Sequence, residues 1–374
     1  MTLPWHEGIF GLTFSVDLDY SNDCDYLHDP AFQMDYRETP EMKRKRIIAL
    51  VAGVIFILVV AAFFLLRKPG SPEKVEKLRV GVAANPICTL VYVAHQQGFF
   101  NRHGLDVTIE GYPAGAYAVD DLLVGKVDVA AAAESVLALW GLQRADLRGI
   151  GTISASDTVE VIARKDRGIE KPEDLKGKLV GVPRGTVNDF FLSVFLSFNN
   201  MHLGEVRTVD LKPDEIVTAL SEGKIDAAVN FTLFVDKIKK RMADKVLSWP
   251  AQGGRNFYFL LFTREELVKT RPGVITAFLE GVLQAETFVK KHEKEAQDIM
   301  KNVLGIDHEV LMSTWSKTRF RVALDQDLLT LMEDEGRWAI KNKLVEAEVI
   351  PDYAAFLYLE GLRKIKPEAV GVTH

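Results

Sequence analysis

The chain has 374 residues, of which 48% are hydrophobic and 26% charged, and its formal net charge is −6. This length allows two globular domains, and without a basic face in the sequence we expect no nucleic-acid binding. The two cysteines, Cys24 and Cys88, exclude a disulfide framework and a four-ligand zinc site.

Residues 1–41 form an acidic segment with nine Asp or Glu residues and one Arg, a net charge of −8. The segment has no sustained helical or strand periodicity and cannot bury a core, which predicts disorder. Two interpretations remain open. It is either a disordered cytosolic tail or an untranslated extension upstream of Met42, which directly precedes the basic run 43–46.

Residues 47–66 predict a transmembrane anchor, because the run IIALVAGVIFILVVAAFFLL has no polar side chain and is one bilayer long as a helix. A buried core helix is the alternative, but charged residues flank the run on both sides. The run also exceeds the h-region of a signal peptide, and no A-x-A-like cleavage site follows. Four basic residues before the run and two after it favour a cytosolic N-terminus, although counts over about 15 flanking residues tie.

The sequence after the anchor repeats one pattern of elements. Two segments occur in both copies: 77–82 with 178–182, and 122–130 with 220–228. A further strand lies between these landmarks in each copy, at 106–110 and 206–211. The order β-α-β-α-β therefore occurs twice and predicts an α/β fold of two parallel-sheet lobes. Ligands of such sheets bind beyond the carboxyl ends of the strands, so two facing lobes would line one cleft.

The stretch KGKLVGVPRGTVNDFFLSVFL at 176–196 carries the strongest candidate site. A strand at 179–182 ends at Pro183, Gly185 permits a tight turn, and Thr186 suits the N-cap of the helix that follows. Free N–H groups and the positive end of the helix dipole would favour a small anion. The residues at this turn are Arg184, Gly185, Thr186 and Asn188. An ordinary strand–helix turn with a solvated arginine is the alternative.

The ends of the other predicted strands supply further candidate ligand-binding side chains. They are Asn85, Thr89, Glu134, Ser135, Ser156, Asp157, Asn230 and Thr232. Most of these residue types are also common in turns and helix caps. Glu134 is more informative, because it ends an alanine-rich strand that should be buried, where a carboxylate needs a partner.

Region 78–374 resembles the solute-binding proteins of ABC importers, in the branch that takes aliphatic sulfonates, taurine, nitrate or thiamine pyrimidine precursors. The segments that carry the resemblance are HQQGFFNRHGLDVTI (95–109), LLVGKVDVAAAAES (122–135), IEKPEDLKGKLVGVPRGT (169–186), ALSEGKIDAAV (219–229) and VIPDYAAFLYLEGL (349–362). The chain departs from the usual pattern at Asn230-Phe231, where an aromatic-plus-carboxylate pair is common. That departure leaves the ligand open.

The resemblance implies a bilobed type II periplasmic-binding fold, with a hinge on which two lobes close over a small molecule. After a linker at 67–77, lobe 1 would comprise 78–161 plus 256–374, and lobe 2 would comprise 162–255. The implied partners are an ABC permease and its ATPase subunits. The binding domain would lie in the periplasm or outside the cell, held to the membrane by the N-terminal helix.

Two other functions remain as alternatives: an enzyme on the same fold in thiamine or menaquinone-precursor synthesis, and a membrane-tethered ligand sensor. The sequence has no HxxxH pair, Cys–His grouping or cysteine-rich signature for the former. No kinase, cyclase or methyl-accepting helix follows for the latter. We therefore expect a binding module with no catalytic residues, metal ligands or cofactor.

The charges at the two sides of the cleft predict the chemistry of the ligand. The 184–186 turn favours a sulfonate, carboxylate or nitrate, whereas Glu134 and Asp157 on the opposite lobe would repel a simple anion. A small amino-sulfonate would satisfy both sides, with its acid group at Thr186 and its amine at the carboxylates. If the two acids pair with lysines or face solvent, a plain alkanesulfonate is expected instead.

Overall fold

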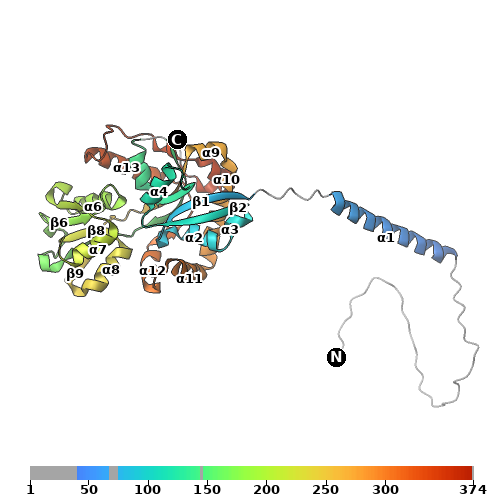
Figure 1. Ribbon diagram of the computed structural model, residues 1–374, viewed down its shortest axis with the longest axis horizontal. Coiled ribbons are helices and arrows are strands. Elements are labelled where there is room, and N and C mark those ends of the chain that lie inside the picture. Colours follow the sequence, from blue (N-terminus) through green and yellow to red (C-terminus); the bar gives the residue numbers. More distant parts are fainter. Residues whose placement is uncertain (1–39, 67–74, 144–145, 373–374) are drawn as a thin grey trace, which may run out of the picture. The chain divides into compact units, whose positions relative to one another are not determined.

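The computed structural model describes residues 40–66, 75–143 and 146–372 (Figure 1). Two units make up the chain, Met1–Pro72 and Glu73–His374. Two predicted segments fall largely outside the described residues. These are the disordered segment 1–41, of which residues 1–39 are not described, and the linker 67–77, of which residues 67–74 are not described.

The first unit contains one helix, α1 (Pro40–Leu66), on which the predicted anchor 47–66 falls. Apolar side chains in its described part are largely exposed, from 52% for Val51 to 70% for Leu50. The side chains of 57–66 lie outside those that the structure describes. Among the described residues, no helix combines the length and the apolar character needed to span a membrane.

The first sheet of the second unit has the strand order β11-β4-β10-β3-β1-β2. Strand β1 pairs in parallel with both β2 and β3, whereas β10 is antiparallel to both β3 and β4. The strands of this sheet are β1 (Glu76–Ala83), β2 (Leu105–Tyr112), β3 (Val129–Ala133), β4 (Leu147–Ser156), β10 (Phe257–Arg264) and β11 (Thr318–Phe320).

The second sheet has the order β7-β6-β8-β5-β9. Strand β6 pairs in parallel with β7 and β8, and β5 is antiparallel to β8 and β9. Its strands are β5 (Val159–Arg164), β6 (Leu179–Val182), β7 (Arg207–Asp210), β8 (Ala227–Phe231) and β9 (Val246–Pro250).

Both sheets are mixed, so the prediction of two parallel-sheet lobes needs correction. The predicted repeat is present, as three parallel strands in each sheet, β2-β1-β3 and β7-β6-β8. The chain enters the second sheet through β5 and returns to the first sheet through β10. Both crossings lie at the edge of the sheets where the parallel strands end. A strand that enters there starts at this edge, so it must run antiparallel to those strands.

The chain crosses between the sheets at 157–158 and again at 251–256. The predicted boundary between 161 and 162 falls inside β5, whose pairing partners both belong to the second sheet. Lobe 2 therefore begins earlier than predicted, because the strand is continuous from Val159. The predicted return at 255–256 lies within the second crossing. Lobe 1 also begins earlier than 78, since β1 starts at Glu76.

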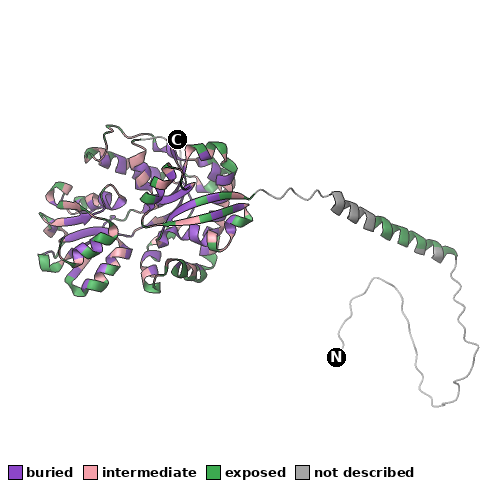
Figure 2. Cartoon of the chain, in the orientation of Figure 1, coloured by how far each residue is buried: buried purple, intermediate pink, exposed green. Residues whose placement is uncertain are grey.

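Helices cover both faces of the sheets, and the strands between them are buried (Figure 2). The helices are α2 (Thr89–Gln96), α3 (Phe99–Arg102), α4 (Gly115–Leu123), α5 (Glu134–Trp140), α6 (Val187–Phe198), α7 (Pro213–Ser221), α8 (Thr232–Met242), α9 (Glu265–Thr270), α10 (Pro272–Lys291), α11 (Glu293–Leu304), α12 (His308–Trp315), α13 (Gln326–Lys341) and α14 (Leu359–Ile365). The Phe100 and Phe278 rings stack with centroids 4.9 Å apart and join α3 to α10.

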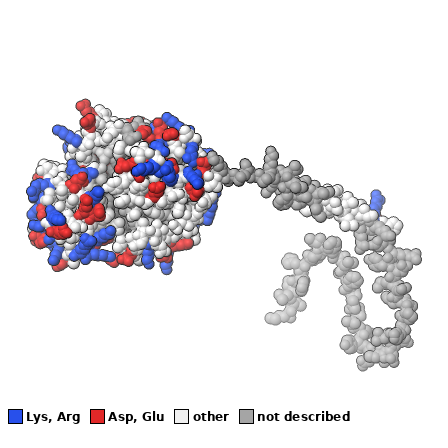
Figure 3. Space-filling view, in the orientation of Figure 1, with Lys and Arg blue, Asp and Glu red and all other residues white. Residues whose placement is uncertain are grey.

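Acidic and basic side chains are interspersed on the face drawn in Figure 3. That face of the second unit carries no continuous basic stripe of the kind that follows a nucleic-acid backbone.

Candidate functional site

A cavity of about 360 Å³ lies between the two lobes and is lined by residues of both. Its wall is built where β1, β3, β6, β7 and β8 end and where the helices after them begin. This is the edge at which parallel strands present ligand-binding groups. The predicted site residues that line the cavity are Asn85, Ser135, Arg184, Gly185, Thr186 and Asn188.

The start of α6 forms the lobe 2 side of the cavity. Thr186 is the N-cap, as predicted, and its Oγ1 accepts a hydrogen bond of 3.2 Å from the Asn188 N–H. Gly185 adopts a φ of +67°, which completes the tight turn before the helix. The backbone N–H groups of Thr186 and Val187 have no acceptor among the described residues. Together with the helix dipole they suit an anion.

The start of α4 forms a second helix terminus at the same cavity, on the lobe 1 side. Its N-cap is Ala114, which has no side-chain acceptor, and the Gly115 and Ala116 N–H groups have no acceptor in the described part of the chain. A Cβ at Gly115 would lie 2.6 Å from the Ala131 carbonyl oxygen, so glycine permits α4 to pack directly on β3. The sequence analysis missed this terminus, because an uncapped helix start has no residue signature.

Three polar side chains face the cavity between these helix termini. Asn188 is 1% exposed, and its Oδ1 has no hydrogen-bond partner. The Ser135 hydroxyl also has no partner within the described residues. Asn85 uses its Oδ1 to accept the Ile87 N–H at 3.1 Å. An anion cannot satisfy the acceptor oxygen of Asn188, but the Asn188 Nδ2, which has no acceptor among the described residues, can donate to a ligand.

The charged groups at the cavity are largely engaged with one another. The Arg184 Nε lies 3.4 Å from Oδ2 of the buried Asp189, which also accepts the Gly185 N–H at 3.1 Å. Burial raises the pKa of Asp189. Asp210 accepts the Arg184 N–H at 3.1 Å, whereas the Lys212 ammonium has no ion pair in the described part. The guanidinium predicted to contact the ligand therefore pairs with Asp189.

Aromatic side chains line the cavity from both lobes, and the sequence analysis did not identify them as site residues. Tyr117 and Phe259 belong to lobe 1, and Phe231 and Phe234 belong to lobe 2. Aromatic residues at helix and strand spacing are typical of a core, so no local signal separates these four from buried phenylalanines.

Glu134 is fully buried but does not line the cavity. Its Oε2 accepts the Tyr258 N–H at 2.7 Å, and its Oε1 has no partner. Burial raises the pKa of Glu134 to about 8. The side chain is directed into the α5–α13 interface and not into the cavity, so its position does not support the expected contact with a ligand amine. There it is close enough to Glu335 of α13 to raise the pKa of that carboxyl.

The remaining predicted residues serve structural roles away from the cavity. Thr89 donates to the Pro86 carbonyl at 2.6 Å, and the Ser156 hydroxyl lies 3.0 Å from the Thr318 hydroxyl. Asn230 donates to the Pro213 carbonyl at 2.9 Å. Their polar groups are satisfied within the protein, as is usual for residues that follow strands.

Asp157 and Thr232 lie near a buried carboxylate, Glu160, rather than at the cavity. Burial raises the pKa of Asp157, whose backbone N–H donates to the Lys317 carbonyl at 3.0 Å. Thr232 donates to Glu160 Oε1 at 2.9 Å. Burial opposes ionisation of Glu160, but hydrogen bonds from Lys317 and Lys239 lower its pKa to about 2. Lys317 belongs to lobe 1 and Glu160 to lobe 2, so this ion pair joins the lobes.

Gln252 connects the two crossings between the lobes. Its side chain is fully buried, accepts the Val159 N–H at 2.8 Å, and donates to the carbonyls of Ser156 at 3.0 Å and Arg255 at 2.9 Å. The side chain of Gln252 therefore ties both crossings together.

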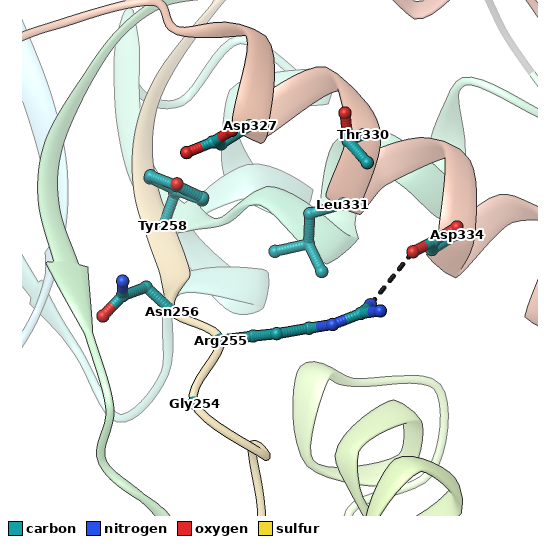
Figure 4. A pocket seen from close by; sticks show the side chains of 8 residues that line it. All are labelled: Gly254, Arg255, Asn256, Tyr258, Asp327, Thr330, Leu331 and Asp334. Atoms are coloured by element: carbon teal, nitrogen blue, oxygen red, sulfur yellow. Dashed lines mark hydrogen bonds and ion pairs between the residues drawn. The ribbon is translucent and has the colours of Figure 1, made fainter.

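A second cavity, of about 340 Å³, lies beside the return crossing, between Gly254–Tyr258 and α13. Figure 4 shows Arg255 extended across its floor to Asp334, with a distance of 3.0 Å between Nη1 and Oδ2. Tyr258 and Asp327 line the other end of this cavity. Its Arg255 guanidinium is already paired with Asp334.

Within the described ranges, no group of three or more His, Cys, Asp or Glu residues is arranged to hold a metal ion. Cys88 is a buried free thiol, and burial raises its pKa, so it does not act as a reactive thiolate.

Two mixed sheets joined by two short crossings around one cavity define a bilobed periplasmic-binding fold. The alkanesulfonate-binding protein SsuA from Xanthomonas axonopodis pv. citri, bound to MOPS, has this fold. It superposes with a TM-score of 0.65 at 15% identity, over 75% of this chain and 98% of that one.

A family model described as NMT1/THI5 like matches residues 85–296, and the chain belongs to this family. A binding protein of Brucella abortus (strain 2308) is 26% identical over 270 residues, which are 71% of this chain and 80% of the relative. The taurine-binding periplasmic protein of Escherichia coli (strain K12) is 27% identical over 191 residues, 50% of this chain and 59% of the relative. The resemblance predicted from the sequence motifs is confirmed.

Proposed function

We propose that this chain is the solute-binding component of an ABC importer and that it captures a small organic anion in the cavity between its lobes. The observation that carries the proposal is the pair of helix termini, one from each lobe, whose N–H groups at Thr186, Val187, Gly115 and Ala116 meet one cavity without acceptors. Relatives named for binding sulfonates or taurine support the same reading.

Binding without catalysis is the role that fits the cavity. Its lining contains no histidine or cysteine, and its one carboxylate, Asp210, already accepts the Arg184 N–H. A nucleophile with an adjacent base is therefore missing from the residues that surround the ligand space. The lobes, joined by a hinge, supply capture and release.

The anion need not carry an amine. The amino-sulfonate prediction depended on Glu134 and Asp157, and neither lines the cavity. The backbone N–H groups favour a sulfonate or carboxylate headgroup. We therefore propose a plain organic anion in place of a zwitterion.

Calorimetry on the purified full-length protein tests whether the ligand must carry a negative charge. Methanesulfonate and methanesulfonamide have similar shapes, but the second is neutral at pH 7. We expect heat of binding from the sulfonate and none from the sulfonamide. Equal binding of the two would contradict an anion site.

A backbone substitution tests the position of the anion. Val187→Pro removes one N–H at the first position of α6, where proline is well tolerated and where Thr186 already has the extended conformation that precedes proline. Affinity for methanesulfonate should fall about 10- to 100-fold, as expected for loss of a hydrogen bond to a charged group. Val187→Ala keeps the N–H and is the matched control. Unchanged affinity in Val187→Pro would place the anion elsewhere.

We further propose that residues 47–66 anchor the chain in the membrane with both lobes outside the cytoplasm. The support is the uninterrupted apolar run and the exposed apolar side chains in the described part of α1. A protease added to intact spheroplasts should release a fragment that begins in the 67–77 linker. Protection until lysis would place the lobes in the cytosol and remove the importer role.

A further inference from the structure

We infer that the anion captured in this cavity carries a planar aromatic ring, so that the ligand is an aryl sulfonate or aryl carboxylate rather than nitrate, taurine or a short alkanesulfonate. The inference rests on the proposed function, because it assigns the body of the ligand whose headgroup the helix termini bind. It is carried by the size of the cavity, its apolar walls and the state of its aromatic side chains.

The cavity is too large for the smallest anions. Its volume of about 360 Å³ far exceeds the roughly 10–15 Å³ that a single water needs by the same kind of measure. Nitrate or a two-carbon sulfonate would leave most of the space to water. An aromatic ring attached to the anionic group would occupy that space.

Apart from the helix termini and the polar side chains described above, the walls are apolar. The apolar lining residues are Ala83, Ile87, Pro113, Ala133, Val136, Pro183, Leu211, Pro213, Phe231, Phe234 and Phe259, with Tyr117 at the start of α4. Water molecules beside apolar walls find few hydrogen-bond partners there. An apolar ligand body that displaces these water molecules therefore increases the affinity. Each lobe contributes two of the aromatic rings, so a flat body can be held from both sides.

Contacts within the folded protein do not explain why a tyrosine stands at position 117. It is 41% exposed, its hydroxyl has no hydrogen-bond partner in the described chain, and its ring contacts no other aromatic ring there. Phe259 likewise has no aromatic partner among the described residues, although it is 4% exposed. Aromatic faces left open at a cavity favour stacking with a ring of the ligand.

The ring site adjoins the anion site along the chain. Tyr117 follows the Gly115 and Ala116 N–H groups within the first turn of α4. On the other lobe, Phe234 follows Phe231 within the first turn of α8, and both line the same cavity as Thr186. A headgroup bonded directly to a ring can therefore reach the N–H groups while the ring contacts these side chains.

Calorimetric titration of the full-length protein with four ligands tests the inference: benzenesulfonate, cyclohexanesulfonate, methanesulfonate and taurine. Burial of the ring should make benzenesulfonate bind about 10- to 100-fold more tightly than methanesulfonate or taurine. It should also exceed cyclohexanesulfonate, which has a similar volume but no flat aromatic face. If cyclohexanesulfonate, methanesulfonate or taurine binds as tightly as benzenesulfonate or more tightly, the inference of an aromatic ring is wrong. The proposal of an anionic ligand would then still stand. If none of the four binds, the anion proposal itself fails.

Substitutions locate the ring contact. Tyr117→Leu and Phe234→Leu keep an apolar side chain but remove the aromatic face, and each should weaken benzenesulfonate binding several-fold more than methanesulfonate binding. Phe198→Leu is the matched control, because Phe198 is 64% exposed and lines a different groove. An equal loss for both ligands, or an effect of Phe198→Leu as large as that of the others, would overturn the assignment.

Discussion

Asn188 shows at the scale of one residue how a binding site reduces the stability of its own protein. Its amide is buried at the start of α6, and its Oδ1 has no partner among the described residues. An apolar side chain of similar size would remove the desolvation cost of that amide. It would also remove a hydrogen-bonding group from the cavity.

Asn188→Leu should therefore raise the free energy of unfolding by about 1–3 kcal/mol while it weakens anion binding by several-fold. Urea denaturation and calorimetry on the same preparation measure both quantities. Asn199→Leu, at the other end of α6, is the control, because the Asn199 amide donates to the Phe195 carbonyl at 2.8 Å. That change should lower stability and leave binding unaltered. A destabilised Asn188→Leu protein would show that the amide has a structural partner.

At the scale of elements, the interface between α5 and α13 buries two carboxyl groups, and no described cation forms an ion pair with either of them. Glu134 and Glu335 are 0% and 1% exposed, and neither oxygen of Glu335 has a partner. Burial raises the pKa of Glu134 to about 8, and burial together with the charge of Glu134 raises the pKa of Glu335 well above its usual range. The folded protein therefore binds protons here that the unfolded chain releases.

The sign of the pH dependence follows from these raised pKa values. The stability from the protonated pair is fully present below about pH 4.5 and is lost as the pH rises toward 8. Glu335→Gln should reduce this loss, an effect on the order of a few kcal/mol, because it removes the buried carboxyl whose pKa burial raises well above its usual range. Urea midpoints at pH 5 and pH 8 measure it. The same loss in both proteins would contradict the shared burial of the two acids.

Glu286 is the control for that experiment, because it is also buried but paired. Burial opposes its charge, yet hydrogen bonds from Lys290 and Lys366 outweigh this effect and lower its pKa. Glu286→Gln should destabilise the protein at pH 8, where Glu335→Gln stabilises it.

The same elements show what sequence reasoning can reach. The strand at 179–182, the Thr186 cap and the β-α-β-α-β repeat were predicted, because each is encoded by neighbouring residues. The direction of β5 and β10 was missed, since it depends on the edge at which a strand enters a sheet. Glu134 was expected to need a partner, and its Oε2 accepts the Tyr258 N–H, but its Oε1 is unpaired among the described residues. Its acidic neighbour Glu335 lies on α13, beyond the reach of local patterns.

The candidate site divides in the same way. The start of α6 was predicted from turn and cap residues, whereas the start of α4 was missed because Ala114 carries no capping side chain. Tyr117 and Phe234 read as core residues, and their position at the cavity is set by contacts between distant segments. The polar residues that follow strands were chosen as candidate ligand-binding residues only because of their residue type. Several of them form hydrogen bonds to other groups of the protein and do not line the cavity.

At the scale of the whole molecule, the lobes are joined by more than their two crossings. Lys317 of lobe 1 donates to Glu160 Oε1 of lobe 2 at 2.9 Å, and Phe190 of α6 packs edge-on against Trp338 of α13 at 5.7 Å. If the lobes move about the two crossings that Gln252 ties together, these contacts oppose that motion.

Lys317→Met should loosen the hinge, because it removes the ion pair between the lobes. Hydrogen exchange followed by mass spectrometry should show faster exchange, by several-fold, in peptides that cover 157–159 and 251–256. Lys239→Met is the matched control: Lys239 donates to the same carboxylate at 3.0 Å but from within lobe 2. Equal effects of the two substitutions at the crossings would show that Lys317 contributes only to local stability.

The position of the anion is the central claim, and a crystal structure of the protein with 4-bromobenzenesulfonate tests it most directly. Bromine gives an anomalous signal that marks the ring, and the sulfonate is then located relative to it. We predict sulfonate oxygens at about 2.7–3.2 Å from the Thr186 and Val187 nitrogens, with the bromine between Tyr117 and Phe234. A bromine peak in the cavity beside Arg255, or along the groove that contains Phe198, would contradict this account.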